Sequence, residues 1–190
     1  MRKLGLSLVM LVFALLGLIQ TAQAIEFQPY VGGGLGHVLM NIEVDGVRSD
    51  RPDSTFGGYA SIGFDYGEYV GGELRIGTTG TASFAVGGIN FDTSVDWFLS
   101  YLAKLQFPVS EQFKIFTMAG GTTTSVTTTI TTPGLLFINT GTNNISQTMT
   151  NGSFGAGADF QTGDQWEVGI EVMLYASGFS TLTANLRYSF

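Results

Sequence analysis

Apolar and polar residues alternate one by one along much of this chain, and the apolar set is the more continuous of the two. In one such stretch Trp166, Val168, Ile170, Val172 and Leu174 occupy one face, while Glu167, Gly169, Glu171 and Met173 occupy the other. A period of two residues is that of a β-strand, in which successive side chains point to opposite faces. The same alternation runs through residues 55–66, 70–76, 95–107 and 181–190.

The alternating stretches and the segments between them predict eight strands, at 27–41, 55–66, 69–79, 92–107, 113–125, 149–161, 166–176 and 180–190. Beyond the amino-terminal 24 residues no apolar run reaches 18 residues, which excludes a helical membrane span. Strands can cross a bilayer only in a closed sheet, where every backbone group is paired. We therefore expect an all-β fold, an eight-stranded antiparallel up-and-down transmembrane β-barrel.

A water-soluble barrel that holds a ligand shows the same alternation, so the polar face has to distinguish the two. Here that face mixes glycine with a few charged residues, and only 12% of the whole chain is charged. Such a face is sparse for contact with water but suits the crowded interior of a narrow barrel. The apolar face would then contact lipid.

The first residues have the features of a secretory signal peptide. Arg2 and Lys3 precede an apolar run over residues 4–19, and Ala22-Gln-Ala24 fits a cleavage site. Sixteen apolar residues are too few for a membrane anchor, which needs about 20. We expect residues 1–24 to be the signal peptide and residues 25–190 to form the barrel domain.

Connections of two lengths alternate along the chain. The segments 67–68, 108–112 and 162–165 are short, whereas 42–54, 80–91 and 126–148 are long and polar. Outer-membrane barrels have short periplasmic turns, longer outer loops and aromatic girdles at both interfaces. The aromatic residues expected in the girdles are Tyr66, Tyr69, Phe107, Phe113, Phe160, Trp166, Tyr188 and Phe190.

Several motifs resemble the eight-stranded transmembrane domain of outer membrane protein A and its small relatives. They are Tyr30-Val-Gly-Gly-Gly-Leu-Gly36, Gly72-Gly-Glu-Leu-Arg-Ile-Gly77, residues 101–110 and 113–121, Phe154-Gly-Ala-Gly-Ala-Asp-Phe160 and Leu186-Arg-Tyr-Ser-Phe190. The resemblance covers essentially all of residues 25–190 and implies the same barrel. It also implies that the alternating carboxyl-terminal residues Leu186, Tyr188 and Phe190 act as a signal to the barrel assembly machinery.

The alternation also predicts which charged residues point into the barrel: Asp65, Glu73, Arg75, Asp96, Lys104, Asp159, Glu167, Glu171 and Arg187. The resemblance implies an interior cluster of Glu73, Lys104 and Asp159 that gates a narrow pore. Gly169 occupies the place of the family's partner arginine, and Arg75 is a candidate substitute. The candidate gate is therefore Glu73, Arg75, Lys104, Asp159 and Glu171. The alternative interpretation is a packed network in which buried charges are simply paired.

The third long connection is the most unusual segment. Residues 122–132 are mostly threonine, and an apolar group of Leu135, Leu136, Phe137 and Ile138 follows Pro133-Gly134. Because threonine favours strands, we expect a hairpin that protrudes from the membrane, with its turn near residues 133–137. Its apolar tip is a candidate surface contact, unless it folds down over the mouth of the barrel.

Composition excludes several function classes. A formal net charge of -7 argues against nucleic-acid binding, and the absence of cysteine excludes thiolate metal sites and disulfides. The only histidine, His37, shares the outward parity of Val31 and Leu35, so a catalytic role for it is remote. Asp45, Asp50 and Asp53 fit a solvated loop of mixed sign better than a cation or phosphate site. We expect no catalytic residues, metal or cofactor.

The main functional hypothesis is a structural or surface-interaction role of the outer loops, in adhesion or envelope integrity. The alternatives are a narrow ion-conducting pore and, remotely, a lipid A-modifying enzyme. The expected partners are outer-membrane lipid and lipopolysaccharide, the barrel assembly machinery, and a host surface or neighbouring envelope proteins.

Overall fold

The computed structural model describes residues 27–40, 43–44, 47–48, 53–86, 89–132, 141–175 and 178–190. These residues are almost entirely β-structure, and no helix among them is long and apolar enough to cross a bilayer. The strands are β1 (Phe27–Met40), β2 (Glu43–Val44), β3 (Val47–Arg48), β4 (Asp53–Tyr66), β5 (Val70–Thr79), β6 (Thr81–Val86), β7 (Ile89–Pro108), β8 (Phe113–Thr132), β9 (Gly141–Gln161), β10 (Trp166–Tyr175) and β11 (Phe179–Ser189).

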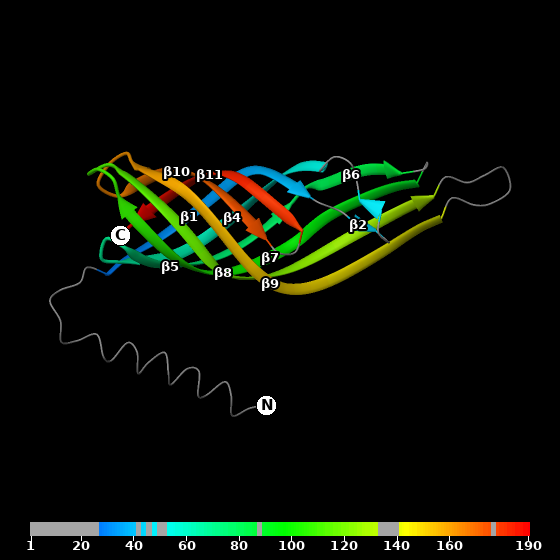
Figure 1. Cartoon of the computed structure of the whole chain (residues 1–190), viewed down its shortest axis with the longest axis horizontal. Coiled ribbons are helices and arrows are strands. Elements are labelled where there is room, and N and C mark those ends of the chain that lie inside the picture. Colours follow the sequence, from blue (N-terminus) through cyan, green and yellow to red (C-terminus); the bar gives the residue numbers. More distant parts are fainter. Residues whose placement is uncertain are drawn as a thin grey trace, which may run out of the picture.

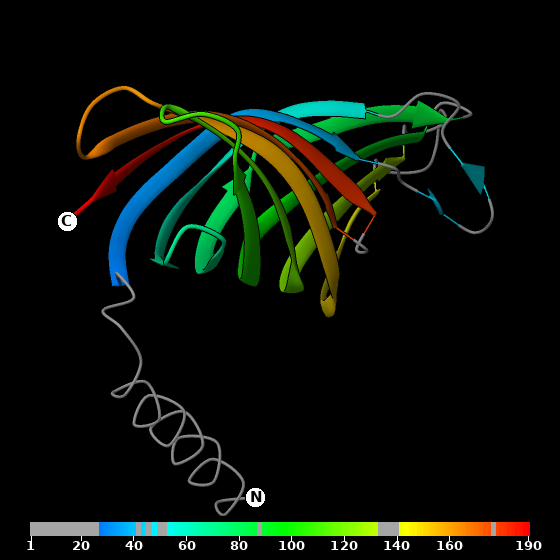
Figure 2. The same ribbon diagram turned by 60° about the vertical axis from the view of Figure 1, so that its left-hand side comes forward.

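Eight of these strands close into a barrel in which every neighbour is antiparallel. The order β5-β4-β1-β11-β10-β9-β8-β7 is closed by pairing of β5 with β7, from Val70 opposite Leu105 to Gly77 opposite Phe98. The first and last strands are also neighbours, since β1 pairs with β11 from Tyr30 to Met40. Figure 2 shows how the sheet curls on itself. The predicted eight-stranded antiparallel barrel is therefore confirmed.

The two ends of the barrel differ, as the connection lengths predict. At one end, called here the short-turn end, residues 67–69, 109–112 and 162–165 connect successive strands, and Phe27 and Phe190 lie there too. Gly67 makes its turn with φ of 63°, a conformation that side chains with a Cβ rarely adopt. The opposite, long-loop end carries the connections between β1 and β4, β8 and β9, and β10 and β11.

At the long-loop end four strands continue past the barrel as a sheet, which we call the extension (Figure 1). It consists of β6, residues 89–95 of β7, residues 126–132 of β8 and residues 141–152 of β9. The prediction that 80–91 is a loop was therefore wrong where β6 and β7 run through it, and the predicted strand ends at 125 and 149 were too short for β8 and β9. The threonine-rich hairpin does protrude as predicted, although its turn lies outside the described residues.

The first long connection also contains more strand than predicted. Within 42–54, β2 and β3 pair as a two-stranded sheet of their own, and β4 begins at Asp53. The side chains of Asp45, Asp50 and Asp53 are outside the part of the chain whose side chains are described.

One irregularity in β7 reverses the predicted inward and outward orientation of two side chains. A bulge in β7 lies between Val95 and Trp97, where the register with β8 shifts. Val95, predicted to face outward, is buried, and Asp96, predicted to face inward, is exposed. Asp96 instead accepts a hydrogen bond from the Thr127 hydroxyl, 2.7 Å away. A bulge inserts one extra residue, so side chains on either side of it no longer follow a single alternation.

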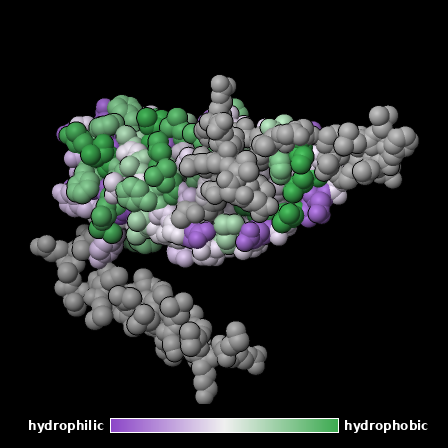
Figure 3. Space-filling view, turned by 45° about the vertical axis from the view of Figure 1, so that its right-hand side comes forward, coloured by the Kyte–Doolittle hydropathy of each residue, from purple (hydrophilic) through white to green (hydrophobic). Residues whose placement is uncertain are grey.

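The outer wall of the barrel is apolar and its inner wall is mixed. Leu74, Leu99 and Ile170 are 48%, 45% and 62% exposed, whereas Arg75, Ser100 and Glu171 beside them in sequence are buried. Figure 3 shows hydrophobic side chains gathered over the barrel wall. Burial is thus inverted relative to a water-soluble barrel, in which large apolar side chains point inward.

Candidate functional site

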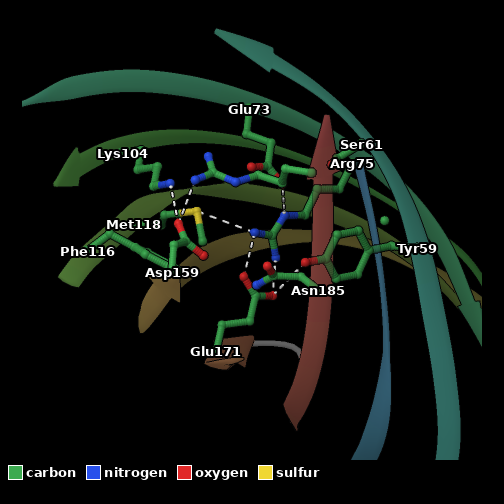
Figure 4. Close-up of a pocket in the computed structure, with 12 residues that line it drawn as sticks. Tyr59, Ser61, Glu73, Arg75, Lys104, Phe116, Met118, Asp159, Glu171 and Asn185 are labelled. Carbon is green, nitrogen blue, oxygen red and sulfur yellow. Dashed lines mark hydrogen bonds and ion pairs between the residues drawn. The ribbon is translucent and has the colours of Figure 1, made fainter. Parts of the chain in front are cut away.

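Arg75 on β5 is the centre of one buried group of ionic contacts inside the barrel (Figure 4). Its Nε lies 2.6 Å from Glu73 Oε1 on the same strand, and its Nη1 and Nη2 lie 2.5 and 2.8 Å from the two oxygens of Glu171 on β10. The Tyr59 and Thr183 hydroxyls also donate to Glu171 Oε1, at 3.0 and 3.1 Å. One guanidinium therefore holds two carboxylates from nearly opposite walls of the barrel.

Arg187 on β11 is the centre of a second group, nearer the short-turn end. Its Nη2 contacts Glu167 Oε2 and lies 2.6 Å from Asp159 Oδ2, which also accepts from Lys104 Nζ at 3.0 Å. Lys114 Nζ reaches the other oxygen of Glu167, at 2.8 Å. Asp159 thus receives two cations on a single oxygen. Together the two groups form the interior charge network.

Tyr30 on β1 connects the two groups. Its hydroxyl donates to Glu73 Oε2 at 2.7 Å, and its ring lies 4.7 Å from the guanidinium carbon of Arg187. Only 2% of the residue is exposed. A buried carboxylate needs such donors, because leaving one unpaired costs more than a lost hydrogen bond.

Crowding around Gly169 explains why the network has no arginine at this position, where the resemblance implies the family's partner arginine. A Cβ at this position would lie 2.7 Å from both Asn185 Oδ1 and the Ala158 carbonyl oxygen, and would also meet Asp159 Oδ1. The inner wall has no room for a side chain there. The positive charges come from Arg75 and Arg187 instead.

The interior is tightly filled around the charge network. Within the charge network the remaining space is only about 10 Å³, which corresponds to roughly one water molecule. Towards the long-loop end the inner wall becomes apolar, and Tyr175 stacks on Phe179 with ring centroids 4.2 Å apart beside Phe98. These rings belong to the apolar layer, the buried apolar side chains Val38, Met40, Ala82, Val95, Phe98, Leu102, Phe116, Met118, Met173, Tyr175 and Phe179. Of these, Phe116 and Met118 reach the charge network, where the Phe116 ring lies 4.3 Å from Lys104 Nζ and Met118 Sδ lies 3.4 Å from Arg75 Nη2. An ion would have to cross both regions.

The five candidate gate residues are all buried in the interior, divided between the two connected groups of the charge network. Glu73, Arg75 and Glu171 lie in the first group, and Lys104 and Asp159 lie in the second. Sequence reasoning did not include Arg187 and Tyr30 in the site. The inward parity of Arg187 was visible in the sequence, whereas nothing in the sequence marked Tyr30 as the donor to Glu73.

The remaining predicted sites have mixed outcomes. Leu186 and Phe190 lie on the outer wall, 45% and 67% exposed, and Tyr188 packs against Trp166 with ring centroids 4.9 Å apart. Their role in assembly stays a prediction. The apolar tip at Leu135, Leu136, Phe137 and Ile138 lies outside the described residues. Among the described residues no cluster of acidic and histidine side chains could hold a metal ion.

His37 lies on the outer wall near the long-loop end, as its parity predicts. It is exposed, and its ring meets that of Phe56 edge-on with centroids 5.4 Å apart. With Trp97, 41% exposed, it belongs to an outward-facing band at that end. At the short-turn end a denser band contains Phe64, Tyr69, Phe107, Phe113, Phe160, Trp166 and Phe190, all exposed on the outer wall. Two such bands are typical of a membrane barrel.

Comparison with known proteins agrees with this architecture. The solved structure of Ail, the attachment invasion locus protein of Yersinia pestis, in complex with the heparin analogue sucrose octasulfate, is 15% identical. That match covers 86% of this chain and 99% of Ail with a TM-score of 0.51. Neisserial surface protein A is 13% identical over 85% of this chain and 97% of its own, with a TM-score of 0.52. A de novo designed transmembrane β-barrel is 11% identical, with coverages of 86% and 95% and a TM-score of 0.50.

At these identities the solved structures establish the fold alone. A search of curated proteins finds no significant sequence match. The family model for the outer membrane protein beta-barrel domain, however, matches residues 8–190, nearly the whole chain. The apolar outer wall is accordingly the lipid-facing surface of a barrel in the bacterial outer membrane, and the predicted transmembrane fold is confirmed. The chain belongs to the outer membrane protein beta-barrel domain family.

Proposed function

We propose that this protein is a closed outer-membrane barrel whose function is to present the extension and the neighbouring loops outside the cell. In this role the protein contributes to adhesion or to envelope integrity. The observation that carries the proposal is a contrast: the space within the charge network has room for about one water, while four strands continue beyond the long-loop end. We propose that this end faces outward, since long loops of outer-membrane barrels do so.

The polarity of the extension supports this role. Its side chains are mostly hydroxyl and amide groups, and residues 142–148 are all exposed. A ribbon held by hydrogen bonds to its neighbours can stand in water without an apolar core of its own. Such a surface can bind partners through side-chain and backbone hydrogen bonds.

The ligand seen with Ail does not fit this extension. Sucrose octasulfate is a polyanion, and recognition of sulfate groups depends on lysine and arginine. Residues 76–103 and 115–158, which contain β6 and the extended parts of β7, β8 and β9, include no lysine or arginine. We therefore propose an uncharged, hydrogen-bonding partner surface rather than a sulfated polysaccharide.

Shortening the extension tests the proposal. Thr124 and Met149 are directly opposite on β8 and β9, so deletion of residues 125–148 and insertion of Asn-Gly creates a two-residue hairpin. The barrel should still fold, as heat-modifiable gel migration would show. Cells that produce this variant should adhere to cultured epithelial monolayers no better than cells without the protein. A folded variant that supports full adherence and full detergent resistance of the envelope would contradict the proposal.

A narrow ion path is the second candidate function, and one contact favours it. Asp159 Oδ2 is shared by Lys104 and Arg187, so Lys104 could leave while Asp159 stays paired. The closed space and the apolar layer oppose conduction in the present conformation. Planar-bilayer recording of the wild-type protein and of Lys104→Met decides between the closed barrel and the pore. A closed barrel predicts no conductance from either protein, whereas a change in conductance caused by Lys104→Met would support the gate.

We propose no enzymatic role. The only histidine in the chain, His37, lies on the outer wall against Phe56, where a hydrolytic substrate and a carboxylate partner have no enclosed site. A lipid A modification assay of the wild-type protein and of His37→Ala checks this. Cells that produce either protein should have the same lipid A profile as cells without it.

A further inference from the structure

The outer edge of β9 is unpaired over the whole extension. β9 pairs with β8 from Gly141 to Phe160, but with β10 only from Ser153 to Gln161. In the part of the chain that the structure describes, residues 141–152 therefore have no strand on their second side. Figure 1 shows this part of β9 running past the ends of β10 and β11. Each second residue along it presents an unpaired N–H and C=O, which is a template for another strand.

This edge lacks the features with which proteins usually prevent strand pairing. Exposed edges are commonly protected by lysine or other charges, by proline or by a bulge. Residues 115–158 contain no charged residue at all, although the chain carries a net charge of -7. β9 contains no proline, and its register with β8 is continuous. A second copy of the same edge would thus meet no like-charge repulsion.

The sequence of this edge is complementary to itself. When two copies of one strand edge pair around a twofold axis they are antiparallel, and one residue lies opposite its own copy. With Gln147 at the axis, polar residues meet polar ones and the exposed Ile145 meets Met149. The other opposed pairs are Asn143 with Asn151, Asn144 with Thr150, and Ser146 with Thr148. Centring the pair on Ser146 instead would place Ile145 opposite Gln147, an apolar group against an amide.

The direction of pairing decides where the second copy is. Every copy inserted in one membrane has β9 running from the outside towards that membrane. Antiparallel pairing reverses this direction, so the two barrels lie at opposite ends of the paired strands. Two copies in the same membrane cannot achieve this unless the strands lie flat on it, and Figure 1 shows the extension continuing the barrel strands.

We propose that residues 141–152 of β9 pair edge to edge with the same residues of a second copy of this chain in a facing outer membrane. The protein would then join cells to one another through a continuous antiparallel sheet. This inference rests on the proposed surface-interaction function and names its partner as the chain itself.

Cysteine cross-linking tests the register, because the chain contains no cysteine of its own. Directly opposed residues have Cα atoms about 4.5–5.5 Å apart, within the range of a disulfide. Two cell populations would produce Gln147→Cys with amino-terminal tags of different size, and would be mixed under copper phenanthroline oxidation. The proposal predicts disulfide dimers that contain both tags. Dimers with only like tags, or no dimers, would overturn it.

Thr129→Cys is the matched control. Thr129 lies on β8 opposite Asn144, one strand away from the free edge. In the proposed pair the two copies of residue 129 are three strand spacings apart across the sheet, roughly 14 Å, and six residues apart along it, roughly 20 Å, which a disulfide cannot bridge. This variant should give no mixed dimers. Equal yields from Thr129→Cys and Gln147→Cys would mean random collision and would also overturn the proposal.

Charge exchange at the axis tests the same pairing without oxidation. Gln147→Lys cells alone and Gln147→Glu cells alone place like charges opposite each other, so their aggregation in suspension should fall about fivefold or more. A mixture of the two populations should aggregate as wild type does. Failure of the mixture to recover would overturn the pairing.

The outcomes separate this inference from the function beneath it. If wild-type cells adhere to epithelial monolayers but never aggregate with each other, self-pairing is wrong and the surface-interaction role stands. If the shortened hairpin variant retains full adherence and envelope resistance, the proposed function itself fails.

Discussion

Arg75 and Glu171 face each other across the interior of the barrel in a two-bond contact, with guanidinium nitrogens 2.5 and 2.8 Å from the two carboxylate oxygens. Both side chains are 1% exposed. This pair joins β5 to β10, which are not neighbours in the sheet. It therefore stabilises the barrel through its interior, in addition to the hydrogen bonds along its wall.

Removing the cation of this pair should be costly. Arg75→Met leaves the carboxylates of Glu73 and Glu171 buried without their main partner, and should lower the free energy of unfolding by about 3–5 kcal/mol. Urea unfolding in lipid vesicles measures the loss. Adding Glu73→Gln and Glu171→Gln to Arg75→Met should recover much of it, because the uncompensated charges are then absent. A single variant within 1 kcal/mol of wild type would contradict this role.

The Tyr30 hydroxyl should contribute a charge-assisted hydrogen bond. Tyr30→Phe keeps the ring beside Arg187 but removes the donor to Glu73, so we expect a loss of about 1.5–3 kcal/mol. Tyr101→Phe is the control, since Tyr101 is 52% exposed on the outer wall. The same unfolding measurement should show a clearly smaller effect there, and equal effects would exclude a special role of the Glu73 contact.

Gly169 should not tolerate even a methyl group. Gly169→Ala places a Cβ against Asn185 and the backbone of β9, and overpacking of this kind costs about 1–3 kcal/mol. Gly163→Ala in the turn between β9 and β10 is the matched change, because nothing lies within 4 Å of a Cβ there. Heat-modifiable migration at increasing temperature compares the two. Similar midpoints for both variants would show that the inner wall at Gly169 is not crowded.

Introducing a charge on the barrel wall should reveal which side meets lipid. Ile170→Lys replaces a residue that is 62% exposed on the barrel wall, and should lower stability by roughly 2–4 kcal/mol if that wall is in the bilayer core. Ile145→Lys is the same change at a residue that is 53% exposed in the extension. Its effect on unfolding should be close to zero. If Ile145→Lys lowered stability more than Ile170→Lys did, the placement of the barrel wall in the bilayer and of the extension in water would be contradicted.

Alternation was enough to predict the barrel, because lipid outside and a narrow interior impose the same two-residue period on every wall strand. It failed at Asp96, where the bulge after Val95 inserts a residue and reverses the faces. Bulges depend on how two strands fit together, so one strand's sequence does not show them. The threonine-rich arm of the extension was predicted from strand propensity, whereas β6 and the start of β7 within 80–91 were missed, because polar strands in water need not alternate.

The interior site was predictable in its charges but not in its pairs. Parity placed Glu73, Arg75, Lys104, Asp159 and Glu171 inside, yet the contacts depend on the stagger between strands far apart in sequence. The first and last barrel strands, β1 and β11, lie side by side and provide Tyr30, which donates to Glu73, and Arg187, which shares Asp159 with Lys104. No local pattern contains that pairing.

The central claim is that lipid contacts the outer wall of this barrel, and tryptophan quenching tests it most directly. The chain has two tryptophans, Trp97 and Trp166, both on the outer wall. With both changed to Phe, Ile170→Trp provides one probe on the wall between the aromatic bands. In vesicles whose acyl chains carry bromine, we predict strong quenching of this probe and little quenching by acrylamide in water. Strong quenching by acrylamide with no effect of brominated lipid would contradict the account.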